Sequence, residues 1–182
     1  AFMSDHFGNF VAANNCIVRF LAISPEFIER RMRLRSTNPA ALNYMNVICS
    51  LDSGYRTTLG HDWSANVLRN MLFFRRITFR YRPRPYFQQL WQALMKNREF
   101  KRFWNESSYR DSVEQASDSD LEVYAYHHTR FDEDVQYIAA VSQIVTPDGE
   151  RYLTTYIPAN KRVAQLFEQS AEEGGEGWIT FS

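Results

Sequence analysis

The order of helical and strand-like patterns along the chain leaves few folds open to it. Residues 24–104 carry apolar side chains at helical spacing, whereas residues 121–157 form three strand-like segments. Pro147 and Gly149 stand between the last two of these segments, where they favour a hairpin turn. Two shorter strand-like segments lie within residues 2–12. This order predicts an α+β fold, in which a five-stranded antiparallel sheet carries a large helical insertion between its second and third strands.

Capping residues and prolines predict where the helices begin and end. Ser24 and Asn38 each precede a proline, which is typical of an N-cap followed by the first helical position. Ser64 is expected to cap a third helix, and Asn97 to interrupt the last helical stretch of the insertion. A final helix is predicted over residues 160–169.

The length of 182 residues predicts one domain with a sizeable core. Within it, residues 24–104 form the helical insertion. Residues 171–182 are rich in Gly and Glu and are expected to be a mobile tail, with docking through Trp178, Ile179 and Phe181 as the alternative. The chain opens inside a strand-like segment, which we interpret as the mark of a piece cut from a longer protein.

Cysteine content and hydropathy indicate the compartment. Cys16 and Cys49 are the only cysteines and both lie in apolar helical surroundings, which favours free thiols in a reducing compartment. No secretory signal is visible, and no apolar run approaches the roughly 20 residues that a membrane span needs. We therefore expect a cytoplasmic protein without a membrane partner.

The opening stretch has the pattern D-x-x-G-x-(apolar)-x-x-x-N, at Asp5, Gly8, Phe10 and Asn14. Asp5 can accept hydrogen bonds from its own turn, Gly8 can adopt a positive φ, and Asn14 can cap the following helix. This pattern resembles the first hairpin and helix of PAS-type sensor domains. The resemblance implies that the hairpin pairs with the strand at residues 151–157 to complete one sheet.

Two helical segments carry a narrower resemblance. HDWSANVLRNMLFFR (residues 61–75) and YFQQLWQALMKNREFKRFW (residues 86–104) resemble the ligand-binding domain of MmyB-like transcription regulators. Phe100 and Trp104 stand four residues apart, where that family has three. The resemblance implies a sensor domain that binds a small apolar molecule, with a long-chain fatty acid as the expected ligand. It also implies that DNA is bound only through a helix-turn-helix domain outside this chain, and a homodimer is a further expectation.

In a PAS-like domain the ligand lies between the inner face of the sheet and the helices. The high aromatic content, 15%, suits either a filled core or an aromatic-lined pocket for an apolar ligand. The side chains expected to line the cavity are Phe73, Phe74, Phe79, Tyr81, Trp91, Leu94, Met95, Tyr124, Tyr126, Tyr137 and Tyr156. Those expected to meet a polar head group are Arg76, Arg80 and His128.

Two other functions remain open. Some PAS domains hold haem through a histidine, and His127 and His128 are adjacent on a predicted strand, so that at most one can face the cavity. A PAS-like domain with a filled core can instead serve only protein interaction or dimerisation.

Several functional classes are not expected. The sequence has no Gly-rich phosphate loop and no GxSxG, HExxH or CxxC motif, so we expect neither an enzyme nor a metal site. The segment FFRRITFRYRPRPY, residues 73–86, mixes Arg with aromatic side chains but matches no nucleic-acid-binding module. No cofactor is expected apart from a bound fatty acid or, in the rival interpretation, haem.

Overall fold

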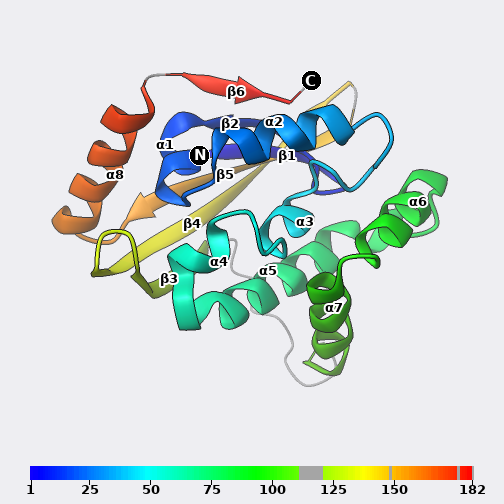
Figure 1. Ribbon diagram of the computed structural model, residues 1–182. Coiled ribbons are helices and arrows are strands. Elements are labelled where there is room, and N and C mark those ends of the chain that lie inside the picture. Colours follow the sequence, from blue (N-terminus) through cyan, green and yellow to red (C-terminus); the bar gives the residue numbers. More distant parts are fainter. Residues whose placement is uncertain (111–120, 148, 176, 182) are drawn as a thin grey trace.

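The computed structural model describes residues 1–110, 121–147, 149–175 and 177–181. Its described strands form one six-stranded antiparallel sheet in the order β3-β4-β5-β1-β2-β6 (Figure 1). The strands are β1 (Phe2–Asp5), β2 (Phe10–Asn14), β3 (Leu121–His128), β4 (Glu133–Thr146), β5 (Gly149–Pro158) and β6 (Trp178–Thr180).

The pairing predicted between the two ends of the chain is confirmed. β1 lies antiparallel to β5, with Met3 opposite Leu153, so the first strand of the sequence is in the interior of the sheet. The prediction of a mobile tail over residues 171–182 is wrong for most of that segment. α8 (Lys161–Gly174) continues past Gln169, and β6 then adds a sixth strand beside β2. The Gly-rich composition predicted no strand here, because β6 has only three residues and is stabilised by a partner strand far away in the sequence.

The opening turn forms as its residues predict. The Asp5 carboxylate accepts hydrogen bonds from the backbone N–H groups of Phe7, at 2.9 Å, and Asn9, at 2.8 Å. Gly8 has φ 79°, and a Cβ there would lie 2.7 Å from the Tyr44 ring. Asn14 caps α1 (Asn15–Phe20) by accepting from the N–H of Ile17. The turn is therefore fixed both by its own hydrogen bonds and by the helix packed on it.

After α1, which Asn14 caps as predicted, the helical section continues to Arg110 rather than ending near residue 104. Its helices after α1 are α2 (Pro25–Leu34), α3 (Tyr44–Ile48), α4 (Tyr55–Leu59), α5 (Trp63–Thr78), α6 (Pro85–Leu94) and α7 (Arg98–Arg110), with 3₁₀ turns at Gly60–Asp62 and Phe79–Tyr81. Residues 111–120, which follow α7, lie outside the described residues.

Of the caps predicted at Ser24, Asn38 and Ser64, the first is confirmed, and Asn97, where an interruption was predicted, caps a new helix. The Ser24 hydroxyl accepts from Phe27 N–H at the start of α2, and the Asn97 side chain accepts from the first-turn amides of α7. Asn38 does not begin a helix, because α3 starts later with Asn43 as its cap. Ser64 lies inside α5, which continues directly from a 3₁₀ turn and so needs no capping side chain at that residue.

The buried side chains form one hydrophobic cluster, in which two parts can be distinguished. One region, which we call the helical core, lies among α5, α6 and α7 and contains Phe74, Leu90, Leu94, Phe100 and Phe103, each at most 1% exposed. The other lies between the β1–β2 hairpin and helices α1 to α3, and it contains the cavity described next.

Candidate functional site

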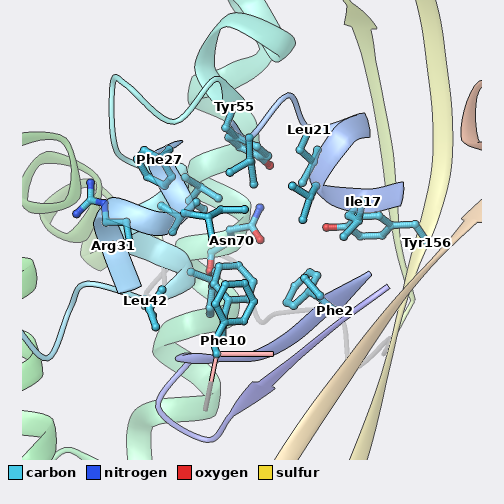
Figure 2. A pocket seen from close by; sticks show the side chains of 18 residues that line it. Phe2, Phe10, Ile17, Leu21, Phe27, Arg31, Leu42, Tyr55, Asn70 and Tyr156 are labelled. Atoms are coloured by element: carbon cyan, nitrogen blue, oxygen red, sulfur yellow. The ribbon is translucent and has the colours of Figure 1, made fainter. Parts of the chain in front are cut away.

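The main cavity of the molecule lies between the N-terminal hairpin and the first helices (Figure 2). β1 and β2 contribute Phe2 and Phe10, α1 contributes Ile17, α2 contributes Phe27, and Tyr156 enters from β5. About 720 Å³ in and around it is free of atoms, and the centre of a water molecule can move through about 60 Å³ of that space. The enclosed part of the cavity is therefore tight, and its walls suit an apolar group.

The lining of the main cavity is almost entirely apolar. Of its described lining residues, Arg31 alone is charged, and Asn70 is the one amide. The hydroxyl of Tyr55 bonds the Asn66 side chain at 2.5 Å, which satisfies that buried polar group. Burial raises the pKa of Tyr55 well above its ordinary value, so the phenol is neutral. Such a lining favours apolar ligand atoms and offers one cation at its edge.

Three further cavities lie near the main one, and two of them share walls with it. An inner cavity beneath the sheet shares Phe2 and Tyr156 with it. A surface hollow beside the end of α5, which we call the α5 hollow, shares Phe73 with the inner cavity. A second surface hollow, near Arg35, shares Phe10 with the main cavity. The four spaces therefore form a series that runs from the α5 hollow through the inner and main cavities to the hollow near Arg35. Aromatic side chains separate each space from the next.

Six of the predicted site residues line these spaces. Phe73 and Tyr124 line the inner cavity, and Tyr156 lines both it and the main cavity. Phe79, which is 68% exposed, lies in the α5 hollow. The two predicted head-group arginines lie there too: Arg76 and Arg80.

Arg80 is already engaged in the α5 hollow. It pairs with Glu150, whose carboxylate also accepts the hydroxyls of Tyr81, at 2.9 Å, and Tyr152, at 3.1 Å. Burial alone would raise the pKa of Glu150, but the hydrogen bonds from Arg80, Tyr81 and Tyr152 outweigh it and hold this pKa below the ordinary value. A ligand carboxylate at Arg80 would thus have to compete with an ionised side chain.

The other predicted residues do not line any of these four cavities. Phe74 and Leu94 are fully buried in the helical core, and Trp91 and Met95 pack against it. Tyr126 and Tyr137 fill the space between the sheet and the helices, at 5% and 1% exposure. The apolar spacing of these residues reflects a filled core rather than a ligand pocket.

His128 also belongs to the core. It is fully buried, and its Nε2 lies 2.8 Å from the carbonyl oxygen of Phe20 in α1. His127 faces the other way, as predicted, and is held between Asp132 and Asp134. None of the four histidines, all within the described residues, lines the four cavities.

Of the predicted residues, Tyr156 alone lines the main cavity, because the helical walls were expected in α5 and α6 and not in α1 to α3. Phe27 and Arg31 are four residues apart in α2 and therefore share one helix face. An arginine on the apolar face of an amphipathic helix was the one signal that could have identified this site.

Metal binding and membrane insertion find no support in the described ranges. No group of three or more His, Cys, Asp or Glu side chains is placed there to hold a metal ion. Within the same ranges, no helix has the length and apolar character needed to cross a membrane.

Comparison with known proteins leaves the site to be interpreted on its own geometry: no protein-family model matches the chain, and no curated protein matches it significantly.

Proposed function

We propose that this chain is a PAS-like sensor domain that binds a long-chain apolar ligand, a fatty acid first of all, in the main cavity. It would act as the regulatory part of a transcription regulator whose DNA-binding domain lies outside this chain. The observation that carries the proposal is the apolar cavity between the N-terminal hairpin and helices α1 to α3.

The sheet supports the resemblance to PAS domains. Five of its strands run in the order β2-β1-β5-β4-β3, with all helices from α1 to α7 inserted between β2 and β3. This is the two-plus-three arrangement expected from the sequence, with β6 as an addition outside β2.

The energetics favour a ligand with a hydrocarbon chain. Each methylene transferred from water into an apolar site contributes about 0.8 kcal/mol. About ten buried methylenes contribute about 8 kcal/mol, which corresponds to micromolar affinity before the cost of immobilising the chain is subtracted, so longer chains are favoured. The aromatic walls between neighbouring cavities, such as Phe2, would rotate to admit the longer chains.

The test is direct binding. Purified protein is extracted and the extract analysed by mass spectrometry for acyl chains, and displacement of a fluorescent fatty-acid analogue is then titrated. Val18→Phe places a larger side chain in the main cavity and is expected to weaken binding at least tenfold. Val145→Phe changes a side chain that is 78% exposed and serves as the control, with unchanged affinity. Absence of any acyl ligand and of any displacement by the unmodified protein would disprove the proposal.

A second candidate, an interaction or dimerisation module, is favoured by the outer face of the sheet. Val123 on β3, Ile144 on β4 and Ile157 on β5 are all exposed, at 51%, 38% and 45%. Exposed apolar side chains that gather on one face are typical of protein contact sites. Light scattering coupled to gel filtration tests this: Ile157→Lys should lower the measured mass of a dimer, and a monomer in the unmodified protein would exclude self-association through this face.

A further inference from the structure

Arg31 occupies an unusual place at the edge of the main cavity. It projects from α2 with only 15% of its side chain exposed, and its guanidinium carbon lies 4.8 Å from the centre of the Phe27 ring. Phe27 is itself a wall of the main cavity (Figure 2). Arg31 thus lines the main cavity while its guanidinium lies at the outer edge, largely shielded from water.

The hydrogen bonds of Arg31 are incomplete. Its Nη2 donates to the Ser50 hydroxyl at 2.7 Å, whereas its Nε is buried and has no hydrogen-bond partner among the described residues. A buried, charged N–H group without a partner is costly, because the lost hydration is not replaced. In a guanidinium, Nε and one terminal nitrogen together fit the two oxygens of a carboxylate.

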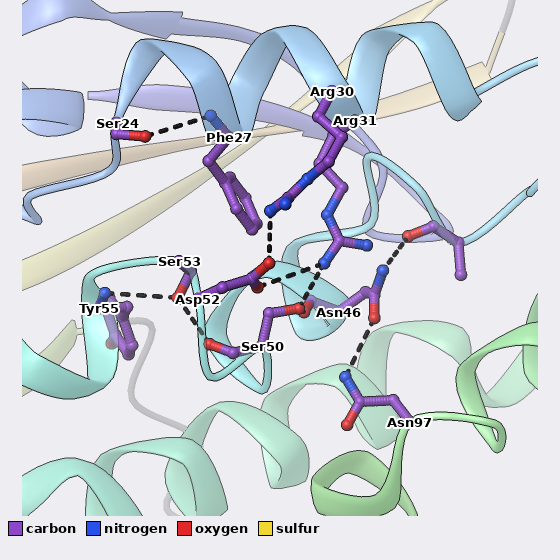
Figure 3. A network of polar contacts seen from close by, with 11 residues as sticks. Ser24, Phe27, Arg30, Arg31, Asn46, Ser50, Asp52, Ser53, Tyr55 and Asn97 are labelled. Atoms are coloured by element: carbon purple, nitrogen blue, oxygen red, sulfur yellow. Dashed lines mark hydrogen bonds and ion pairs between the residues drawn. The ribbon is translucent and has the colours of Figure 1, made fainter.

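The charge of Arg31 is also poorly balanced. The nearest carboxylate is that of Asp52, 3.9 Å from Nη2, and Asp52 is more closely paired with Arg30 (Figure 3). Burial lowers the pKa of Arg31, with the charge of Asp52 acting in the opposite direction. An arginine nevertheless remains a cation at neutral pH. The Asp52 carboxylate is therefore shared by two arginines, and it interacts more weakly with Arg31 than with Arg30.

The surrounding network holds the Arg31 site in place before any ligand arrives. The Ser50 hydroxyl donates to the carbonyl of Asn46 at 2.5 Å, and the Asn46 side chain donates to the Ala40 carbonyl at 2.8 Å and accepts from Asn97 at 3.1 Å (Figure 3). These bonds join α2, α3 and the start of α7. A group bound at Arg31 would therefore meet a preorganised partner.

We infer that Arg31 recognises the anionic head group of the ligand and so determines that the cavity prefers acids over neutral chains of the same length. This inference rests on the proposed function, since it assigns the head-group end of the same cavity. It replaces Arg76, Arg80 and His128, which the sequence suggested for this role, with a residue that lines the main cavity itself.

The test compares palmitic acid with palmityl alcohol in the displacement assay at neutral pH. The unmodified protein is expected to bind the acid about tenfold or more tightly than the alcohol, as a charge-assisted hydrogen bond in a shielded site implies. Arg31→Met should abolish this preference while leaving the affinity for the alcohol unchanged. Arg33→Met, at an exposed position of the same helix, is the matched control and should keep the preference.

A second variant keeps the inference testable if Arg31→Met does not fold. Asp52→Asn removes the internal carboxylate near Arg31 and should tighten acid binding about two- to fivefold with no effect on the alcohol. Equal binding of acid and alcohol by the unmodified protein, or an equal loss of both in Arg31→Met, would overturn the role of Arg31 and leave the cavity proposal standing. If neither ligand binds the unmodified protein, the proposed function itself fails, and this inference with it.

Discussion

The helical core and the main cavity are both apolar and both rich in aromatic side chains, yet only one of them is filled. In the helical core, Phe74 contacts the rings of Phe87, Phe100 and Trp104, with ring centres 6.2–6.5 Å apart. In the main cavity, Phe10 and Phe27 surround a space that no side chain fills. The difference shows that aromatic composition alone does not locate a binding site.

The difference follows from how the walls are built. The helical core consists of three helices whose apolar faces meet and interdigitate, as helices of this length do. The main cavity lies between a hairpin and helices α1 to α3, and the side chains of these elements leave part of the space between them unfilled.

The largest expected effect comes from removing one leucine from each region. Leu94→Ala in the helical core should reduce the free energy of unfolding by about 4 kcal/mol, because every contact of the side chain is lost in a tightly packed site. Leu21→Ala at the cavity wall should cost only about 2 kcal/mol, because part of that side chain already faces empty space. Urea unfolding monitored by circular dichroism measures both. Equal losses would mean that the cavity is closed in solution.

Enlarging one valine in each region gives the next effect in size. Val67→Phe in α5 overpacks a fully buried position and should destabilise the fold by about 2 kcal/mol. Val47→Phe in α3 projects into the main cavity and should change stability by less than about 1 kcal/mol. Thermal unfolding of both variants alongside the unmodified protein provides the measurement. A loss at Val47 as large as the loss at Val67 would contradict the comparison.

The smallest effect concerns pH and the filled region around His128. Burial lowers the pKa of His128, and its hydrogen bond to the Phe20 carbonyl offsets part of this. The folded state disfavours the imidazolium form of His128. The stability that the neutral side chain contributes is therefore fully present above the unfolded-state pKa of about 6.5, and it is lost as the pH falls towards the lower pKa of the folded state. The free energy of unfolding should therefore fall between about pH 7.5 and about pH 5.5. This fall should be smaller in His128→Gln than in the unmodified protein, by about 1 kcal/mol or less.

His61→Gln is the control for this pH dependence, because the His61 side chain is 84% exposed. A pH dependence that is the same in His128→Gln as in the unmodified protein would show that His128 does not contribute.

The parts of the fold that depend on neighbouring residues could be predicted from the sequence. The Asp5–Gly8 turn and the caps at Asn14 and Ser24 are local devices whose hydrogen bonds span two to four residues. The pairing of β1 with β5 was predicted because the hairpin pattern resembles a known arrangement. β6 could not be predicted in this way. Its three residues are too few to show the alternation of apolar and polar side chains that identifies a strand, and its partner strand lies near the other end of the chain.

The candidate site was predicted only in part, for a related physical reason. The sequence pattern of an apolar helix face is the same whether that face packs against another helix or borders an empty space. Leu94 and Phe74 were therefore assigned to a cavity that they do not line. Tyr156 and Tyr124 were placed correctly on the inner face because strand alternation fixes the side on which a residue lies. Which part of that face stays empty depends on the lengths of the elements that cover it.

The interior position of β1 has a consequence for the order in which this chain can fold. Met3 pairs with Leu153, which lies 150 positions later, so the sheet is divided until β5 has been synthesised and has reached the hairpin. During that time both edges of the β1–β2 hairpin offer unpaired backbone groups to any other strand nearby. Closing so long a loop is slow, and exposed edges of this kind are where nascent chains associate wrongly. The step that completes the sheet is thus also the step at which synthesis of this protein is most exposed to aggregation.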